Sequence, residues 1–208
     1  MNYEILLGFI LATAALGVSP GPDNIFVLTQ SIANGRKYGL ATVAGLMTGC
    51  LVHTSFLAFG VSTIIKNNNT VFLIIKLFGV AYLLYLSYLV YKVGDTIELN
   101  REVAPQKGVL ALFRKGFVMN VLNPKVTIFF LAFFPGFLFS NSLNTIWQFY
   151  ILGFIFILVS FMIFAAIAIL AGAISTYILR TPKAGFFLKW LQIVVFVGIA
   201  IYLLLSDK

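Results

Sequence analysis

Ser19-Pro20-Gly21-Pro22-Asp23-Asn24 is the stretch that decides the fold, because it places two prolines, a glycine and a carboxylate inside an apolar segment long enough to cross a bilayer. Each proline removes a backbone hydrogen-bond donor, and its ring clashes with the carbonyl four residues earlier. We therefore predict that the helix breaks here. A second helix should start after Gly21 or Ser19, with Pro22 or Pro20 in its first position.

A helix that starts at this point presents backbone N–H groups at the positive end of its dipole, which favours an anion. Here we expect the free N–H groups to be those of Asp23, Asn24 and Ile25. The carbonyls of Leu16 and Val18 lose their usual partners at the prolines and can face a cation. The broken segment is thus predicted to suit a zwitterion.

A second stretch, Asn123-Pro124-Lys125, repeats this arrangement inside another apolar segment. An offset of 102 positions superimposes Pro22 on Pro124 and Asp23 on Lys125. Interrupted hydrophobic segments at corresponding places in two halves indicate a transporter site near the bilayer midplane. An inert kink is the alternative for one proline taken alone, but the matched pair with opposite charges favours a site.

The composition places the chain in a membrane. It is 61% hydrophobic and 10% charged with a mean hydropathy of +1.04, whereas a soluble domain has about a quarter charged residues. The net charge of +8 does not indicate nucleic acid, because the basic residues stand at the ends of apolar runs. The single cysteine, Cys50, excludes an internal disulfide, and we interpret it as a packing residue.

Six apolar runs are long enough to span, and the fifth has surplus length that tilting would absorb. They lie at about Ile5 to Ile32, Leu40 to Ile65, Val71 to Tyr91, Phe113 to Phe139, Ile146 to Ile178 and Phe186 to Leu205. We predict an all-α integral membrane protein with one transmembrane domain, residues 1–208. Repeat 1 covers about 1–92, a polar connecting loop 93–112, and repeat 2 about 113–208.

Basic residues favour the cytoplasmic side, so their distribution predicts orientation. With six spans, ten cations share one side: Arg36, Lys37, Lys92, Arg101, Lys107, Arg114, Lys115, Arg180, Lys183 and Lys189. Lys66, Lys76 and Lys208 lie towards the other. Both termini should then be extracytoplasmic. Three spans in each half make the halves inverted relative to one another, with the first and fourth helices broken.

Asp23 and Lys125 both fall deep within the bilayer. A helical rise of about 1.5 Å per residue puts Lys125 roughly 15 Å and Asp23 roughly 20 Å from the cytoplasmic edge. A lone charge at such a depth is costly, so each should be paired or face water. We expect them to pair with one another, either as part of the site or as a structural lock between the halves.

Two other features carry weaker predictions. His53 is the sole histidine and lies in an apolar run, where it could relay protons or hydrogen-bond a neighbouring helix. Gly39, Gly45 and Gly49 allow close helix packing, either within the chain or in a homodimer. Zinc-protease motifs, Cys/His clusters and Walker loops are absent from the sequence, so we expect neither an enzyme nor a metal or cofactor site.

At these residues the chain resembles the lysine exporter (LysE/RhtB) family of bacterial amino-acid efflux proteins. The resemblance covers essentially the whole length. It rests on Ser19 to Pro22, the run from Gly35-Arg36-Lys37-Tyr38-Gly39 through Gly45 and Gly49, Gly79 to Leu84, and Phe117 to Lys125. It implies secondary-active export of amino acids or close derivatives across the bacterial cytoplasmic (inner) membrane, without an attached ATPase.

The combined prediction is a proton-coupled exporter that holds an amino acid between the two breaks. The carboxylate of the amino acid would bind the N–H groups near Asp23 and Asn24 or lie by Lys125. The ammonium of the amino acid would meet freed carbonyls or Asp23. Three alternatives remain: a half-helix channel for water or small neutral solutes, a cation exporter, and a structural membrane assembly protein. Neither the particular substrate nor the coupling stoichiometry follows from the sequence.

Overall fold

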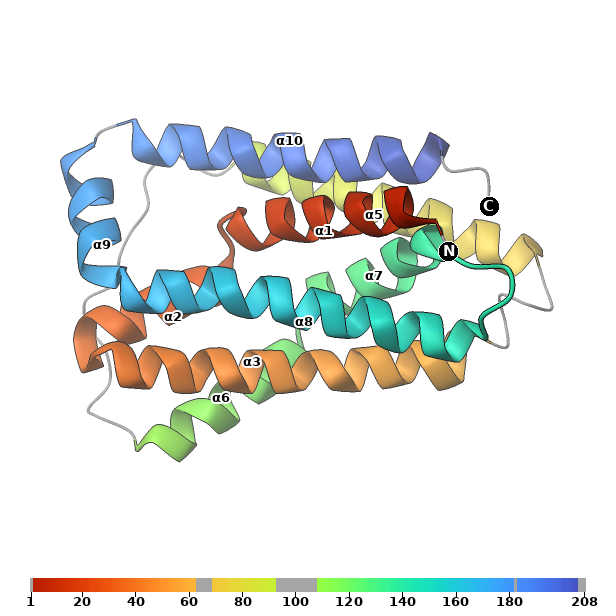
Figure 1. The fold of residues 1–208 in the computed structure, drawn as a ribbon. Helices are drawn as coiled ribbons and strands as arrows, with labels where there is room; N and C mark the ends of the chain where they lie inside the picture. The colour runs from red at the N-terminus through yellow and green to blue at the C-terminus, as the bar shows by residue number, and fades with distance from the viewer. Residues whose placement is uncertain (1, 63–68, 93–107, 182, 206–208) are drawn as a thin grey trace.

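The computed structural model describes residues 2–62, 69–92, 108–181 and 183–205, and this part of the chain is all-α (Figure 1). Its elements are α1 (Tyr3–Val18), α2 (Pro22–Asn34), α3 (Arg36–Phe56), the π-helical turn η1 (Leu57–Val61), α5 (Asn69–Lys92), α6 (Val109–Val121), α7 (Pro124–Phe133), the 3-10 turn η2 (Phe134–Phe137), α8 (Thr145–Ile169), α9 (Ala171–Arg180) and α10 (Ala184–Leu205). Most of the predicted connecting loop, residues 93–107, lies outside the described residues.

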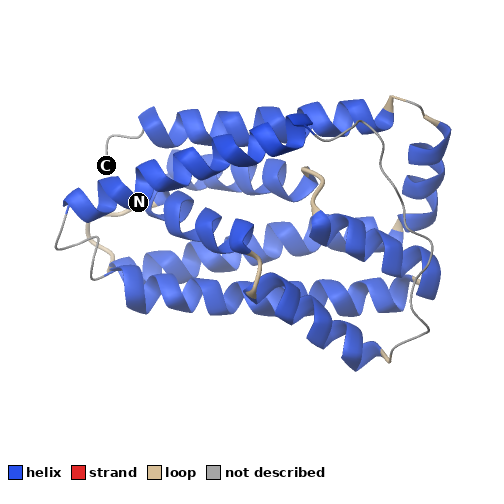
Figure 2. Ribbon diagram, turned by 180° about the vertical axis from the view of Figure 1, so that it is seen from behind, coloured by secondary structure: helices blue, strands red, loops and turns tan. Residues whose placement is uncertain are grey.

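The long helices lie side by side as a bundle (Figures 1 and 2). Within the described residues, 4 helices are long and apolar enough to cross a membrane: α3 with η1, α5, α8 and α10. Two further pairs meet at sharp bends, α1 with α2 at 57° and α6 with α7 at 52°. Counting each bent pair as one span gives up to 6 spans, which confirms the helical membrane fold with a broken first and fourth helix. The inverted relation of the halves stays a prediction.

Two predicted boundaries were wrong. The fifth span does not reach Ile178, because α8 ends at Ile169 and the backbone leaves helical geometry at Leu170 (φ −91°, ψ 12°). A helix of 25 residues is about 37 Å long, already enough for a hydrocarbon core of about 30 Å. The remaining residues form α9, which lies across one end of the bundle (Figure 1). The fourth span starts at Val109, earlier than predicted, with Gly108 as its N-cap.

Apolar side chains cover the outside of the bundle, and polar ones occupy parts of its interior. Phe154 and Phe187 are 67% and 68% exposed, whereas Asn120, Gln148 and Ser160 are buried. Lipid accepts exposed apolar groups, while polar groups at membrane depth need protein around them. The distribution is that of a bundle surrounded by lipid.

A core of aromatic rings holds the short helix α7 inside the bundle. Along one face, α7 and η2 bury Phe129, Phe130, Phe133, Phe134 and Phe137. Rings one turn apart pack with centroids 4.1 to 4.4 Å apart, and Phe9 of α1 packs against three of them. This packing fixes the start of α7 about midway along the bundle (Figure 1).

Glycines let α3 and α6 come together at short range. A Cβ on Gly45 would collide with the carbonyl oxygen of Phe113, and one on Gly116 would collide with that of Thr42. The other glycines of the α3 run are in contact as well: Gly39 lies against Ser31 of α2, and Gly49 against Asn120 of α6. All three predicted packing glycines thus have partners within the chain. A homodimer stays a prediction.

Candidate functional site

The first break has the geometry expected of a proline-started helix. α1 ends at Val18, and Gly21 is the extended N-cap of α2 (φ −154°, ψ 174°), with Pro22 in the first helical position. A proline there loses no hydrogen bond, because the first N–H of a helix has no partner within it. Of the two predicted starts, the structure has the one at Gly21 and Pro22.

Two hydrogen bonds connect residues on the two sides of this break or at its end. The Asn24 amide Nδ2 donates to the carbonyl oxygen of Gly17 at 2.8 Å, so α2 is tied back to the end of α1. The Ile25 N–H donates to the carbonyl of Gly21 at 3.0 Å. The prediction of a free N–H at Ile25 was therefore wrong, because regular helical bonding resumes at that residue. The N–H groups of Asp23 and Asn24 belong to the first turn, before that bonding begins.

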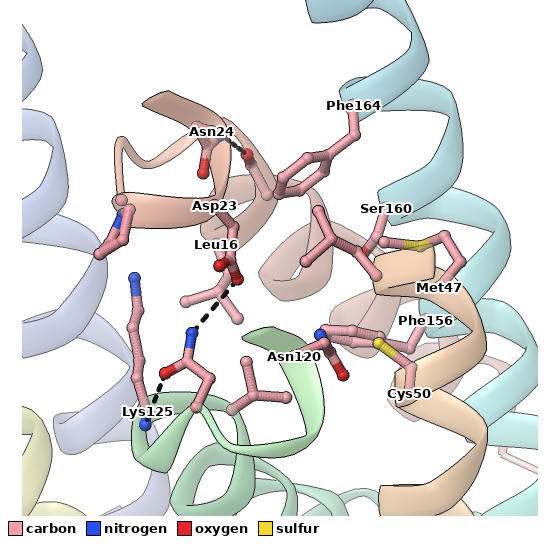
Figure 3. Close-up of a pocket in the computed structure, with 16 residues that line it drawn as sticks. Leu16, Asp23, Asn24, Met47, Cys50, Asn120, Lys125, Phe156, Ser160 and Phe164 are labelled. Atoms are coloured by element: carbon pink, nitrogen blue, oxygen red, sulfur yellow. Dashed lines mark hydrogen bonds between the residues drawn. The ribbon is translucent and has the colours of Figure 1, made fainter. Parts of the chain in front are cut away.

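The second break is built in the same way and touches the first. Pro124 is in the first helical position of α7, and the Oδ1 of Asn123 accepts the Lys125 N–H at 3.0 Å as an N-cap. The other end of the same side chain crosses to α2, where Nδ2 donates to Asp23 Oδ2 at 3.2 Å (Figure 3). Asn123 thereby joins the starts of the two half-helices.

The predicted direct ion pair between Asp23 and Lys125 is not formed. Among the described residues, no contact within 4.0 Å links the carboxylate to the ammonium, and the carboxylate instead accepts a hydrogen bond from Asn123. The Lys125 Nζ lies 4.6 Å from the ring centroid of Phe196, and a Cβ on Gly21 would be only 3.3 Å from it. The two charges are neighbours in one site without being closed upon each other.

These groups border one cavity in the middle of the bundle (Figure 3). It holds about 550 Å³ of empty space, including the part that opens to solvent. Its lining comes from α1, α2, α3, α6, α7, α8 and the two breaks: Leu16, Gly17, Gly21, Pro22, Asp23, Asn24, Leu46, Met47, Cys50, Asn120, Asn123, Lys125, Val126, Phe156, Ser160 and Phe164. Most of the residues predicted from the two proline stretches are therefore brought together.

The other predicted residues lie near the cavity without lining it. Ser19 is buried, and its hydroxyl has no hydrogen-bond partner among the described residues. Pro20 belongs to the link between α1 and α2, and Pro124 starts α7. The buried His53 donates from Nε2 to the carbonyl oxygen of Asn120 at 3.1 Å, which is a hydrogen bond to a neighbouring helix. Its role as a proton relay stays a prediction.

Sequence reasoning missed the half of the cavity that α3, α6 and α8 contribute. Its members include Met47, Cys50, Asn120, Phe156 and Ser160. They are single residues within apolar runs, with no motif that groups them. Only Asn120 offered a signal, since a carboxamide within a membrane span calls for a partner. Among the described residues, no group of three or more His, Cys, Asp or Glu side chains is placed to hold a metal.

In this helical membrane bundle, the second halves of two broken spans begin at one internal cavity. That is the architecture of a membrane transporter. The chain belongs to the LysE type translocator family, which it matches over residues 14–207. This confirms the family resemblance, and it makes the protein a translocator and not an enzyme.

Two curated relatives carry the name homoserine/homoserine lactone efflux protein. One is from Salmonella typhimurium (strain LT2) and one from Salmonella typhi. Each is 31% identical over 183 residues, which cover 88% of this chain and 87% of the relative. No solved structure matches the chain.

Proposed function

We propose that this protein exports homoserine or a closely related small amino acid or derivative from the bacterial cytoplasm, using the proton gradient. The observation that carries the proposal is the meeting of two half-helix starts, with Asp23 and Lys125, at one cavity. The names of the two relatives support the substrate class.

The cavity offers complementary groups for both ends of a zwitterion. The substrate carboxylate is bound by the Lys125 ammonium and by the first-turn N–H groups of α2, which lie at the positive end of a helix dipole. The substrate ammonium is bound by the Asp23 carboxylate. Because Asp23 and Lys125 are not in direct contact, the substrate does not have to break an ion pair to enter between them.

Asp23 is also the group proposed to couple transport to protons. It is the acidic side chain among the lining residues, and it accepts the hydrogen bond that joins α2 to Asn123. Protonation removes the negative charge of that acceptor and weakens the bond, since hydrogen bonds to ionised groups are about twice as strong as neutral ones. Proton binding would thus loosen the contact between the broken spans.

The proposed orientation has both termini extracytoplasmic. Arg36 and Lys37 start α3, Lys92 ends α5, Arg180 ends α9, and Lys183 precedes α10. These helix ends gather at one end of the bundle, whereas α1 begins and α10 ends at the opposite one (Figure 1). An excess of lysine and arginine marks the cytoplasmic side, which supports the assignment.

Export is tested with purified protein in liposomes that carry a proton gradient. Wild type should accumulate homoserine against its concentration gradient. Asp23→Asn should lose uphill transport, and any exchange that it keeps should be weaker than that of wild type, because the substrate ammonium has lost its carboxylate partner. Glu4→Gln, which neutralises an exposed acid at the start of α1, is the matched control and should behave as wild type. Uphill transport by Asp23→Asn at the wild-type rate would remove Asp23 from the coupling role. Absence of amino-acid transport by wild type would overturn the proposed function.

A further inference from the structure

The cavity has two chemically different ends (Figure 3). One carries the ionised groups Asp23 and Lys125 together with Asn123. The other is formed by α3, α6 and α8, where Asn120 and Ser160 stand among mainly apolar neighbours such as Met47, Phe156 and Phe164. No ionisable carboxylate or amine lies in that half of the lining. A ligand with its ionised groups at the first end therefore places an uncharged side chain at the second.

Asn120 stands out within the second end. Its side chain is 4% exposed, and its Oδ1 is buried with no hydrogen-bond partner among the described residues. Buried polar atoms are nearly always paired, because an unmade hydrogen bond leaves the cost of dehydration uncompensated. That oxygen packs against Gly49, so the Nδ2 amide of the same side chain is the group that can donate a hydrogen bond to a ligand in the cavity.

The chain holds this carboxamide in place from α3. Gly49 makes room for it, because a Cβ there would lie 2.6 Å from Oδ1 and 2.8 Å from the Cβ of Asn120. The backbone carbonyl of Asn120 accepts the hydrogen bond from His53. Two residues of α3, spaced one turn apart, thus fix both the backbone and the side chain of one residue on α6.

We propose that the Asn120 carboxamide binds the side-chain hydroxyl of the substrate and so selects small hydroxylated amino acids over apolar ones of the same size. The inference rests on the proposed function, because it requires the zwitterionic part of the substrate to lie at Asp23 and Lys125. A site built to pair with a hydroxyl rejects an analogue that lacks it, since its own polar group is then left unpaired. The apolar neighbours exclude an amino acid with a charged side chain, because burial of a charge without a partner is costly.

Homoserine and norvaline provide the test, because norvaline has a methyl group where homoserine has its hydroxyl. In liposomes, wild type should transport homoserine at least about tenfold better than norvaline, the effect of one well-placed hydrogen bond. Asn120→Leu should lower homoserine transport about tenfold and leave norvaline transport unchanged or raised. Val118→Leu is the matched control on the same helix, since Val118 is 50% exposed, and it should keep the wild-type ratio.

The outcomes separate the inference from the proposed function. Transport of amino acids by wild type, with a homoserine-to-norvaline ratio that Asn120→Leu and Asn120→Ala leave unchanged, would overturn the inference alone. Equal loss of both substrates in these variants would make Asn120 a structural residue and would also overturn it. Absence of any amino-acid transport by wild type would overturn both.

A measurement on wild type alone covers the case in which the variants do not fold. Homoserine should raise the melting temperature of the purified protein more than norvaline does at the same concentration, because the ligand that binds the folded state more tightly stabilises it more. Equal stabilisation by the two amino acids would overturn the inference without any variant.

Discussion

Asn123 is the residue through which the two broken spans touch. Its oxygen caps α7 and its amide donates to the Asp23 carboxylate on α2. One side chain therefore both starts a helix and links it to a second helix about 100 positions earlier in the chain. Any movement that separates the starts of α2 and α7 must break this bond, so Asn123 is well placed to report the state of the cavity.

We predict that Asn123→Ala destabilises the protein more than loss of a cap alone. A lost N-cap costs about 1 kcal/mol, and a lost hydrogen bond to a charged group about 1.5 to 3 kcal/mol. Asn144→Ala is the control, because Asn144 caps α8 through Ile146 at an exposed position. Thermal unfolding in detergent should show the larger decrease for Asn123→Ala, together with loss of export. Equal decreases with normal export would mean that the bond to Asp23 contributes nothing.

At the scale of the elements, close approach of α3 and α6 determines the shape of the cavity. Gly45 and Gly116 bring the two backbones together, and Gly49 admits Asn120 between them. The aromatic face of α7 then anchors the second half of the broken span. Small residues in one place and large rings in another thus fix where the cavity forms within the bundle.

Gly45→Ala should be strongly unfavourable, since the new methyl group meets the Phe113 carbonyl oxygen. Overpacking of this kind costs about 1 to 3 kcal/mol. Gly198→Ala on α10 is the matched control, because a Cβ there has nothing within 4 Å, and alanine is favoured over glycine in a helix by about 1 kcal/mol. Melting temperatures should fall for Gly45→Ala and hold or rise for Gly198→Ala. A parallel change in both would contradict the close contact of α3 and α6.

At the scale of the whole molecule, the ends of the bundle differ in charge. The end of the bundle at which α9 lies also holds the basic residues at the start of α3, at the end of α5 and before the start of α10 (Figure 1). The turn before α8 lies at the opposite end, where α1 begins (Figure 1). If the positive end is cytoplasmic, the cavity between them is reached from the two sides in turn as the broken spans move.

Cysteine labelling on cells should establish this orientation. The one native cysteine, Cys50, is 1% exposed and should give little background with a membrane-impermeant maleimide. Asn141→Cys, in the turn before α8, should react in intact cells. Gly172→Cys, on α9, should react only after the membrane is permeabilised. The reverse pattern would place the termini in the cytoplasm and contradict the assignment from positive charge.

The sequence by itself determined the features that depend on near neighbours and on composition. Proline and glycine act on the backbone within a few residues, so the breaks before Pro22 and Pro124 could be predicted, as could the broken first and fourth spans. Apolar runs of sufficient length define membrane spans whatever their partners are. The family could also be predicted, because the resemblance rests on short stretches of sequence such as Ser19 to Pro22.

Only the tertiary structure decided which side chains meet across the bundle. The sequence paired Asp23 with Lys125 by their positions, but the carboxylate contacts Asn123. Asn120 lies within the stretch from Phe117 to Lys125 that carries the family resemblance, yet its place in the cavity was not predicted. α9 likewise turns away from the span that its apolar residues had suggested. The physical reason is that contacts between distant segments depend on the rotation and spacing of the helices. Those are set by packing over the whole bundle, such as that at Gly45 and Gly49, and not by any one stretch of the chain.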